Sequence, residues 1–329
     1  MNNYLFFRTD RIGDFLVSAI LIKSIKRNNQ NSYIIVISSE SNYYYIKSFS
    51  FIDEVILYPK NYLKKIGLFF HLLKKKYNLI GVLDGKKNSI YFSFFLKSKY
   101  KILITGKKIY KRLFKYIYTR IFLFKESLSR IDEIKEILNI ISFNFDSTDQ
   151  NLFEKRIFIS EVNFKIQKNY LLLHFDEKWI YKDYIKEYSS IEPNFNEFVD
   201  FIEILTKKIS QNIVISTGNI NNPIINKFYD SLEKYNNKFH YKELNGNYLF
   251  VAKNLNFFEL ESLVKNSSIV ITCHGAVTHL ASSLNKKIID IFDKSKKDFY
   301  YKWNKHMKNY NYIFRKNFNE LTLEILKKI

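Results

Sequence analysis

Apolar and polar positions along the chain follow two alternating patterns. Short apolar runs of the kind that form buried strands, such as residues 4–7 and 33–38, are followed by stretches in which apolar residues recur every three or four positions. The first of these helical stretches begins directly after Asp14. Strands that alternate with helices predict parallel pairing with helical crossovers. The chain is therefore predicted to be an α/β protein.

The same pattern predicts the individual elements and two domains. A polar, mixed stretch over residues 142–161 separates the halves, so we expect one domain at 1–160 and a second at 161–329. The helix at 61–76 is expected to bury an apolar face of Leu63, Ile66, Phe70 and Leu73. Strands are expected at 4–7, 33–38, 54–58, 79–83, 101–104, 170–174, 212–216, 248–252, 268–272 and 287–292, and helices at 15–26, 61–76, 89–96, 110–124, 127–141, 196–210, 223–235, 257–266, 276–284 and 321–329.

Composition supports two ordinary cores and points to an anionic partner. The chain has 329 residues, of which 47% are hydrophobic, and its formal net charge is +21. Such a charge suits nucleic acid, an anionic membrane face or a phosphorylated substrate. Basic residues are dense at 64–76, 97–115 and 294–308, and in the first two segments they are interleaved with Phe, Tyr and Leu. This mixture forms either an amphipathic, lipid-facing surface or a plain solvated face.

Cysteine content and apolar run lengths exclude several classes of protein. A single cysteine, Cys273, excludes a disulfide framework and a cysteine metal cluster, and it fits a reducing compartment. The N-terminus runs directly into the first strand, so no signal peptide is expected. The longest apolar runs, such as 66–73, fall short of the ~20 residues that a spanning helix needs.

Residues 8–14, Arg-Thr-Asp-Arg-Ile-Gly-Asp, form the first candidate site. They connect the first strand to the first helix, and ligands of open α/β sheets bind at the carboxyl ends of strands. Gly13 would let the backbone or a ligand approach closely. Asp14 stands where the helix starts, either as its N-cap or as a carboxylate that faces a ligand.

Residues 270–284 form the second candidate site. A strand ends, Gly275 permits a tight turn, and small residues start a helix. The N–H groups and dipole of a helix N-terminus suit a phosphate or diphosphate. His279 lies about one turn into this helix, where it either reaches the same opening or packs as an ordinary buried histidine.

Three segments resemble glycosyltransferase family 9, the ADP-heptose:lipopolysaccharide heptosyltransferases. Residues 8–14 with the helix after them resemble the family's N-terminal signature. Residues 274–281, His-Gly-Ala-Val-Thr-His-Leu-Ala, resemble its C-terminal signature, which usually runs Asp-Ser/Thr-Gly-x-x-His-Leu-Ala. Between them, residues 174–179, His-Phe-Asp-Glu-Lys-Trp, resemble the strand-end segment that carries a donor-binding lysine. The segments stand in the family's order.

The resemblance implies a GT-B type fold, with two Rossmann-like domains facing across a cleft. The N-terminal domain would bind the acceptor, the C-terminal domain would bind a nucleotide sugar, and transfer would be inverting, without metal or cofactor. Asp14 matches the proposed general base, and Asp10, Arg11, Gly13 and Lys86 are expected to contact the acceptor. The residues expected to bind the donor are Lys178, His274, Gly275, Ala276, Val277, Thr278 and His279, together with Thr217 and Gly218 at the end of the strand 212–216.

The C-terminal signature departs from the family at its first three positions. His274, Gly275 and Ala276 replace the family's Asp, Ser/Thr and Gly. A histidine can hydrogen-bond a phosphate or ribose, so an altered donor, a subfamily variant and lost activity all stay open. His274 and His279 lack a carboxylate or cysteine cluster beside them, so no metal site is expected.

The sequence thus predicts a cytoplasmic monomer, peripheral at the inner face of the cytoplasmic membrane. Its donor would be ADP-heptose or a similar nucleotide sugar, and its acceptor a lipopolysaccharide core, another glycolipid or an oligosaccharide. One alternative is an inactive nucleotide-sugar-binding homologue. A nucleic-acid-binding protein is disfavoured because no recognisable module is present. A dehydrogenase is disfavoured because no G-x-G-x-x-G follows a strand.

Overall fold

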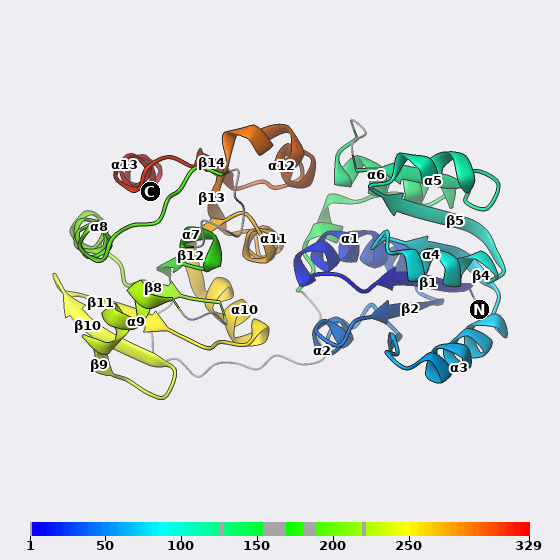
Figure 1. Ribbon diagram of the computed structural model, residues 1–329, viewed down its shortest axis with the longest axis horizontal. Coiled ribbons are helices and arrows are strands. Elements are labelled where there is room, and N and C mark those ends of the chain that lie inside the picture. Colours follow the sequence, from blue (N-terminus) through cyan, green and yellow to red (C-terminus); the bar gives the residue numbers. More distant parts are fainter. Residues whose placement is uncertain (1, 125–127, 154–168, 181–187, 219–221) are drawn as a thin grey trace. The chain divides into compact units, whose positions relative to one another are not determined.

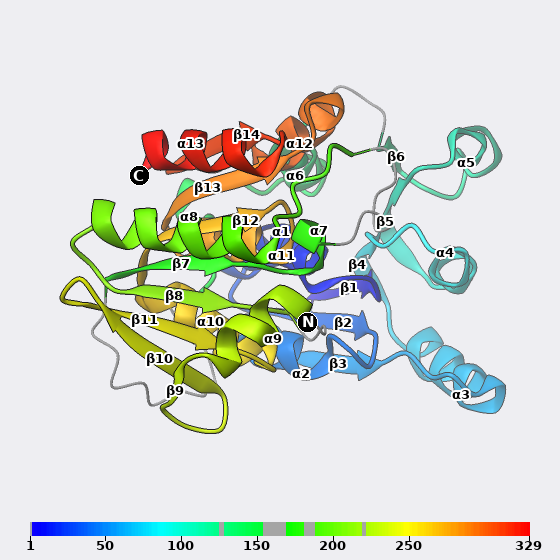
Figure 2. The same cartoon turned by 60° about the vertical axis from the view of Figure 1, so that its left-hand side comes forward.

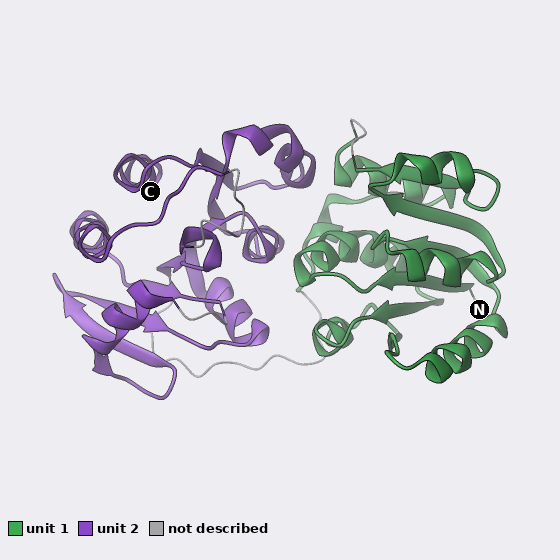
Figure 3. Ribbon diagram, in the orientation of Figure 1, with its two compact units in different colours: residues 1–158 green, residues 159–329 purple. Residues whose placement is uncertain are grey.

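The computed structural model describes residues 2–124, 128–153, 169–180, 188–218 and 222–329. The chain divides into two compact units, residues 1–158 and 159–329 (Figure 3). The domain boundary expected near residue 160 falls within 154–168, outside the described residues.

Unit 1 is built on a six-stranded parallel sheet (Figure 1). Its order is β3-β2-β1-β4-β5-β6, so the chain winds outward in one direction from β1 and in the other from β4. The carboxyl ends of β1 and β4 therefore flank the point where the winding reverses, which is where such sheets bind ligands. The strands are β1 (Asn2–Arg8), β2 (Ser32–Ser38), β3 (Glu54–Leu57), β4 (Tyr77–Val82), β5 (Ser98–Thr105) and β6 (Arg120–Leu123).

Helices cover both faces of this sheet. Leu68 and Leu72 of α3 join Leu5 and Phe7 of β1 in one core cluster, while α1 contacts α6 on the opposite face (Figure 1). Leu5 and Phe7 share a face because alternate residues of a strand point the same way. The helices are α1 (Ile12–Asn28), α2 (Tyr43–Lys47), α3 (Tyr62–Leu73), α4 (Lys87–Phe94), α5 (Lys108–Leu113) and α6 (Arg130–Ile140), followed by a 3₁₀ turn at Ser147–Gln150.

Two predictions for unit 1 are wrong. The single helix expected at 110–124 is a short helix, α5, followed by β6, which pairs with β5. The run Ile121-Phe122-Leu123 is rich in residues that suit a pleated edge, and pairing with β5 outweighs its helical spacing. The helix at 61–76 exists as α3, but it buries Leu68 and Leu72, whereas Leu63 and Phe70 are 75% and 58% exposed.

Unit 2 is built on an eight-stranded sheet in the order β14-β13-β12-β7-β8-β11-β10-β9. Strands β14 to β11 in this order are parallel, and β10 pairs antiparallel with both β11 and β9. The winding reverses between β7 and β12. The strands are β7 (Tyr170–His174), β8 (Ile213–Ser216), β9 (Glu233–Lys234), β10 (Phe239–Leu244), β11 (Asn247–Ala252), β12 (Ser267–Cys273), β13 (Lys287–Phe292) and β14 (Tyr310–Phe314).

Most helices of unit 2 follow the expected pattern, but one ends early, and the helices at Glu177–Ile180 and Lys297–Asn304 were not predicted. Phe198, Phe201, Ile202 and Leu205 of α8 are buried, as predicted. The helix expected at 223–235 ends at Asp230, because the following residues form β9 against β10. The helices are α7 (Glu177–Ile180), α8 (Phe195–Lys208), α9 (Pro223–Asp230), α10 (Phe257–Asn266), α11 (Ala276–Ser283), α12 (Lys297–Asn304) and α13 (Phe318–Lys328).

Candidate functional site

A buried arginine organises the loop between β1 and α1. Arg8 is 4% exposed and donates a hydrogen bond to the carbonyl of Leu83 at the end of β4. Its Nη1 lies 3.0 Å from Oδ2 of Asp10, and its Nη2 lies 3.9 Å from Oδ1 of Asp14. Two carboxylates of the first motif thus flank one guanidinium, which fixes their positions at the carboxyl end of the sheet.

Asp14 is not the N-cap of α1. The N-cap is Arg11, and Asp14 is the third residue of the helix, with a side chain that is 31% exposed. The Asp14 carboxylate therefore does not serve as the helix cap, and it stays partly exposed. Gly13 is buried one residue before it, and Arg11 is exposed.

Asp10 is the carboxylate of this motif whose pKa is raised. Burial raises the pKa of Asp10 to about 6; the guanidinium of Arg8 opposes the shift, and the charges of Asp14 and Asp84 add to it. Asp10 therefore changes its charge in a range where many enzymes work, and it does so beside the proposed base.

Side-chain hydrogen bonds tie the ends of β1 and β4 together. The hydroxyls of Thr9 and Ser89 each donate to Oδ2 of Asp84, both at 2.7 Å. Nζ of Lys86 donates to the carbonyl of Thr9 at 2.6 Å. The Asp84 carboxylate thus holds the turn after β4 against the motif that contains Asp14.

Gly85 is required in this turn. Its φ is +60°, and a Cβ added there would lie 2.8 Å from the carbonyl oxygen of Ile104. Any other residue would combine an unfavourable backbone conformation with a clash against backbone. The turn that carries Lys86 is therefore fixed in shape.

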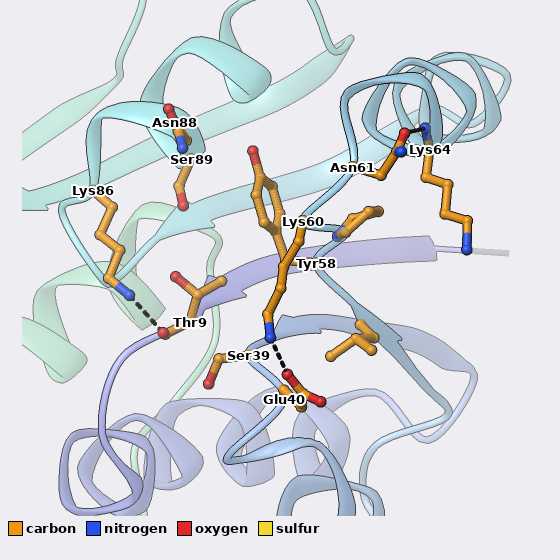
Figure 4. Close-up of a pocket in the computed structure, with 12 residues that line it drawn as sticks. Thr9, Ser39, Glu40, Tyr58, Lys60, Asn61, Lys64, Lys86, Asn88 and Ser89 are labelled. Carbon is orange, nitrogen blue, oxygen red and sulfur yellow. Dashed lines mark hydrogen bonds and ion pairs between the residues drawn. The ribbon is translucent and has the colours of Figure 1, made fainter.

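Unit 1 contains a pocket of about 610 Å³ at the carboxyl ends of its strands (Figure 4). This volume lies in the range of small-molecule sites. Lys86 lines the pocket, whereas Asp10, Arg11, Gly13 and Asp14 are not among its lining residues. The lining is mostly polar and basic: Thr9, Ser39, Glu40, Leu57, Tyr58, Pro59, Lys60, Asn61, Lys64, Lys86, Asn88 and Ser89.

In unit 2, Lys178 is a held cation rather than a solvated surface lysine. Its side chain is 18% exposed, and its Nζ lies 2.5 Å from Oδ2 of Asp176. Burial alone would lower the pKa of Lys178, but Asp176 and Glu177 outweigh burial and the pKa is raised. Arg315, directly after β14, donates to the carbonyl of Lys178 at 3.0 Å and so anchors the turn.

The absence of a side chain at Gly275 lets the ammonium of Lys178 lie at the N-terminal tip of α11. A Cβ added to Gly275 would lie 2.8 Å from Nζ of Lys178, so the glycine lets the cation approach the helix N-terminus. The N–H of Gly275 donates to the hydroxyl of Thr278 at 3.1 Å, which closes the first turn. Lys178 and the tip of α11 therefore form one positively polarised corner.

His274 belongs to a buried network around Asp290, a residue of β13 with 0% exposure. Nδ1 of His274 and the hydroxyl of Tyr310 both lie 2.7 Å from Oδ2 of Asp290, and the hydroxyl of Thr278 donates to Oδ1 at 3.0 Å. The His274 ring also lies 4.1 Å from that of Tyr300, centroid to centroid. A carboxylate thus stands beside the tip of α11, supplied by the neighbouring strand.

Two further histidines and the cysteine of this region are buried and uncharged. Burial lowers the pKa of His174 to about 4 and that of His279 well below its usual value, and it raises the pKa of Cys273. His279 is 6% exposed. These groups therefore pack within the unit and do not carry charge near neutral pH.

The remaining expected donor residues also gather at this edge. Thr217 and Gly218 follow β8, and a Cβ added to Gly218 would lie 3.5 Å from Oε2 of Glu177. Ala276 and Val277 form the first turn of α11. Because β12, β7 and β8 are neighbours, their carboxyl ends bring all nine expected donor residues to one edge of unit 2.

Sequence reasoning missed the carboxylates that position these groups. Asp84, Asp176 and Asp290 were not singled out, although each follows or interrupts an apolar strand run. A lone aspartate within Lys-Ile-Ile-Asp-Ile-Phe was a usable signal, because a buried charge needs partners. Arg130 of α6 was missed too; burial lowers its pKa, and the charges of Glu133, Arg8 and Asp14 also act on it.

The described part of the chain shows neither a metal-binding cluster nor a membrane-spanning helix. Within the described ranges, no group of three or more His, Cys, Asp or Glu side chains could hold a metal ion. No helix in the described part of the chain is long and apolar enough to cross a membrane.

Comparison with known proteins gives a fold but no sequence match. No family model and no curated protein matches the sequence. The structure is similar to E. coli heptosyltransferase WaaC with ADP, with a TM-score of 0.68, 10% identity, and coverage of 99% of this chain and 100% of that one. It is also similar to the glycosyl transferase family 9 protein of Veillonella parvula, with a TM-score of 0.65, 12% identity, and coverage of 99% and 91%.

The chain has the fold of glycosyltransferase family 9. The resemblance carried by the three motifs is thereby confirmed for the fold, which is of the GT-B type. This family 9 fold also resembles a UDP-N-acetylglucosamine 2-epimerase of Listeria monocytogenes, described as putative, with a TM-score of 0.56, 11% identity, and coverage of 99% and 87%. The fold alone is therefore compatible with both sugar transfer and sugar isomerisation. The residues of the candidate site have to distinguish these two activities.

Proposed function

We propose that the protein is an inverting, metal-independent glycosyltransferase. It moves a heptose or related sugar from a nucleotide-diphosphate donor to a lipopolysaccharide core or another surface glycan. The observation that carries this proposal is the contact between Lys178 and the glycine at the tip of α11. A held ammonium beside a helix N-terminus is the arrangement that a leaving diphosphate requires.

The donor would bind at the edge of unit 2. The Lys178 ammonium would contact the diphosphate together with the N–H groups of residues 276–278. His274, held through Nδ1 by Asp290, would offer Nε2 to a phosphate or ribose oxygen. The structure of WaaC contains ADP, and we take an adenosine diphosphate sugar as the first donor to test.

The acceptor would bind in unit 1. Its hydroxyl oxygen attacks the anomeric carbon, the bond from that carbon to the β-phosphate oxygen breaks, and the hydroxyl proton passes to the carboxylate of Asp14. Asp10, Arg11, Gly13 and Lys86 would orient the acceptor. Lys60, Lys64 and Lys86 around the pocket suit an acceptor that carries phosphate or carboxylate groups. We further propose that the protein works as a cytoplasmic monomer.

The alternatives predict different outcomes. An inactive homologue, suggested by His274 in place of the family's Asp, would bind the nucleotide without turnover. An epimerase would convert the nucleotide sugar in the absence of any acceptor. A nucleic-acid-binding protein would not bind nucleoside diphosphates.

The donor site can be tested by thermal stabilisation with ADP and other nucleoside diphosphates. We expect a ligand at a hundred times its Kd to add about 2.7 kcal/mol to the free energy of unfolding. Replacing Lys178 alone would leave the buried Asp176 carboxylate unpaired and destabilise the protein. The variant Lys178→Met/Asp176→Asn removes both charges, so it should recover stability while losing at least about tenfold in nucleotide affinity.

A control variant distinguishes the loss of a lysine in general from the loss of nucleotide binding. Lys287→Met, on the same sheet, removes a partly buried lysine that contacts the carbonyl of Ile329 and should leave nucleotide binding unchanged. No stabilisation of the wild-type protein by any nucleoside diphosphate would contradict the proposal. Equal stabilisation of the double variant would remove Lys178 from the site.

A further inference from the structure

One segment of unit 1 carries most of the excess positive charge of the chain. Residues 60–117 contain sixteen lysines and arginines and a single acidic residue, Asp84, a net charge of +15. The whole chain carries +21, so the other 271 residues contribute only +6. A segment that excludes acidic residues so strongly is complementary to an anionic surface.

The same segment exposes an unusual number of large hydrophobic side chains. Nineteen large hydrophobic residues are exposed in the described part of the chain, and ten of them lie between residues 60 and 117. On α3, Leu63, Ile66 and Phe70 fall on one side of the helix, opposite the buried Leu68 and Leu72. The apolar stripe that the sequence predicts to face the core therefore faces outward.

Helix α5 is largely exposed. It has no buried residue, and Ile109 and Leu113, one turn apart, are 53% and 59% exposed. Tyr116 in the following turn is 88% exposed, and Nζ of Lys115 lies 4.6 Å from the centre of its ring. A helix that packs on the core mainly through Tyr110, yet displays other apolar residues among lysines, has the composition of a membrane-surface element.

Helices α3, α4 and α5 form one continuous layer. The ring of Phe69 on α3 packs edge-on against Phe92 of α4 at 5.4 Å, and Phe94 of α4 packs against Phe114, directly after α5, at 4.8 Å. The three helices lie in a row along one side of unit 1 (Figures 1 and 2). Their inner aromatic residues hold the layer together, which leaves the outer residues to form a common face, here called the α3–α5 face.

We propose that the α3–α5 face docks on an anionic lipid bilayer. Lysines would contact the lipid head groups, and the exposed Leu, Ile, Phe and Tyr side chains would enter the boundary with the acyl chains. Exposed aliphatic side chains favour a bilayer over nucleic acid, since a phosphate backbone gives them no apolar environment. The face adjoins the pocket, because Asn61 and Lys64 at the start of α3 and Asn88 of α4 also line it. Docking would therefore hold the pocket close to the membrane surface.

The test is co-sedimentation with lipid vesicles in the absence of any sugar donor, so its result is independent of sugar transfer. Wild-type protein should bind phosphatidylcholine vesicles that contain phosphatidylglycerol, should not bind pure phosphatidylcholine vesicles, and should lose binding as salt is raised. Leu63→Ser/Phe70→Ser should weaken binding at least about tenfold, because it removes two inserted side chains. Lys108→Gln/Lys115→Gln should weaken it about fivefold for each lysine.

Matched variants in unit 2 serve as controls. Ile204→Ser/Leu323→Ser replaces equally exposed aliphatic side chains on α8 and α13 and should leave vesicle binding unchanged. If the α3 variant melts early, Ile109→Ser/Leu113→Ser on α5 repeats the test at a helix without buried residues. Binding that is insensitive to the variants in α3 and α5 would overturn the proposal. Binding to duplex DNA with no binding to anionic vesicles would overturn it in favour of a nucleic-acid partner.

Discussion

At the scale of single residues, Arg8 determines how the first motif works. Its guanidinium is buried between Asp10 and Asp14, so one fixed charge acts on both carboxylates. Asp10 is the more buried carboxylate and has a pKa raised to about 6. Asp14 keeps a side chain that is 31% exposed at the start of α1. The more accessible carboxylate is the one that matches the proposed base.

The raised pKa of Asp10 predicts a measurable pH dependence of stability. Between the unfolded pKa of 3.8 and the folded pKa of about 6, the folded state holds a proton that the unfolded state has lost. The free energy of unfolding should therefore fall as pH rises from about 4 to about 6 and then level off, by at most about 3 kcal/mol from this residue. Asp10→Asn should flatten this fall, as measured by urea unfolding across that pH range. An unchanged slope in the variant would show that Asp10 does not titrate there.

The sequence predicted candidate ligand-contacting residues but not the residues that hold them in place. The resemblance to family 9 singled out Asp14 and Lys178 as candidates, and the strand-end turn singled out Gly275. Asp176 and Asp290 act through Lys178 and His274, and such contacts depend on which strands become neighbours. Strand order is a property of the folded sheet, so the pattern along the chain could not supply these partners.

At the scale of secondary-structure elements, the tip of α11 shows how the altered signature is accommodated. His274 stands where the family 9 signature has an aspartate, and it contacts the buried carboxylate of Asp290 on the neighbouring strand β13. The hydroxyl of Thr278 bonds to that carboxylate as well, so the first turn of α11 depends on it. A carboxylate is therefore present beside His274, although the signature segment itself has none.

This arrangement predicts that placing the aspartate of the family 9 signature at position 274, with no other change, lowers the stability of the protein. His274→Asp would place a second carboxylate within contact of Asp290, and the repulsion should lower the free energy of unfolding near neutral pH by roughly 1–3 kcal/mol. Adding Asp290→Asn should recover most of the loss, which chemical unfolding of the single and double variants would measure. A single variant as stable as the wild-type protein would contradict this view of the network.

Element prediction succeeded where one periodicity dominated and failed where two competed. Strands β7 and β13 appear at their predicted bounds because each is a short apolar run between polar turns. Helix α3 carries apolar residues on both sides, so its spacing identified a helix but not the side that packs. The segment 110–124 combined helical spacing with strand-forming residues, and pairing with β5 decided it.

At the scale of the whole molecule, both units place their candidate residues at the same topological position. In unit 1 the motif follows β1 and the turn with Lys86 follows β4; in unit 2 Lys178 follows β7 and Gly275 follows β12. In each sheet these are the two strands between which the winding reverses. The alternation of strands and helices predicted this α/β architecture. The antiparallel β9 and β10 were not predicted, because they extend the edge of a finished parallel sheet.

The charge distribution predicts that the two proposed partners respond differently to salt. Most of the net charge lies in residues 60–117 of unit 1, while the proposed donor site of unit 2 relies on Lys178 and a helix terminus. High salt should therefore weaken the binding of a lipid surface much more than the binding of a nucleotide to a partly buried site. The two partners would be recognised by different physical means.

The most direct measurement of the central claim is turnover by Asp14→Asn, compared with wild-type protein at saturating nucleotide sugar and acceptor. We expect kcat to fall by a factor of about 10²–10⁴, which is the usual contribution of a general base to the rate. The Kd for the nucleoside diphosphate should stay the same. Asp298→Asn, which alters a first-turn carboxylate of α12, should retain wild-type turnover. An Asp14→Asn protein that transfers sugar at the wild-type rate would contradict the account.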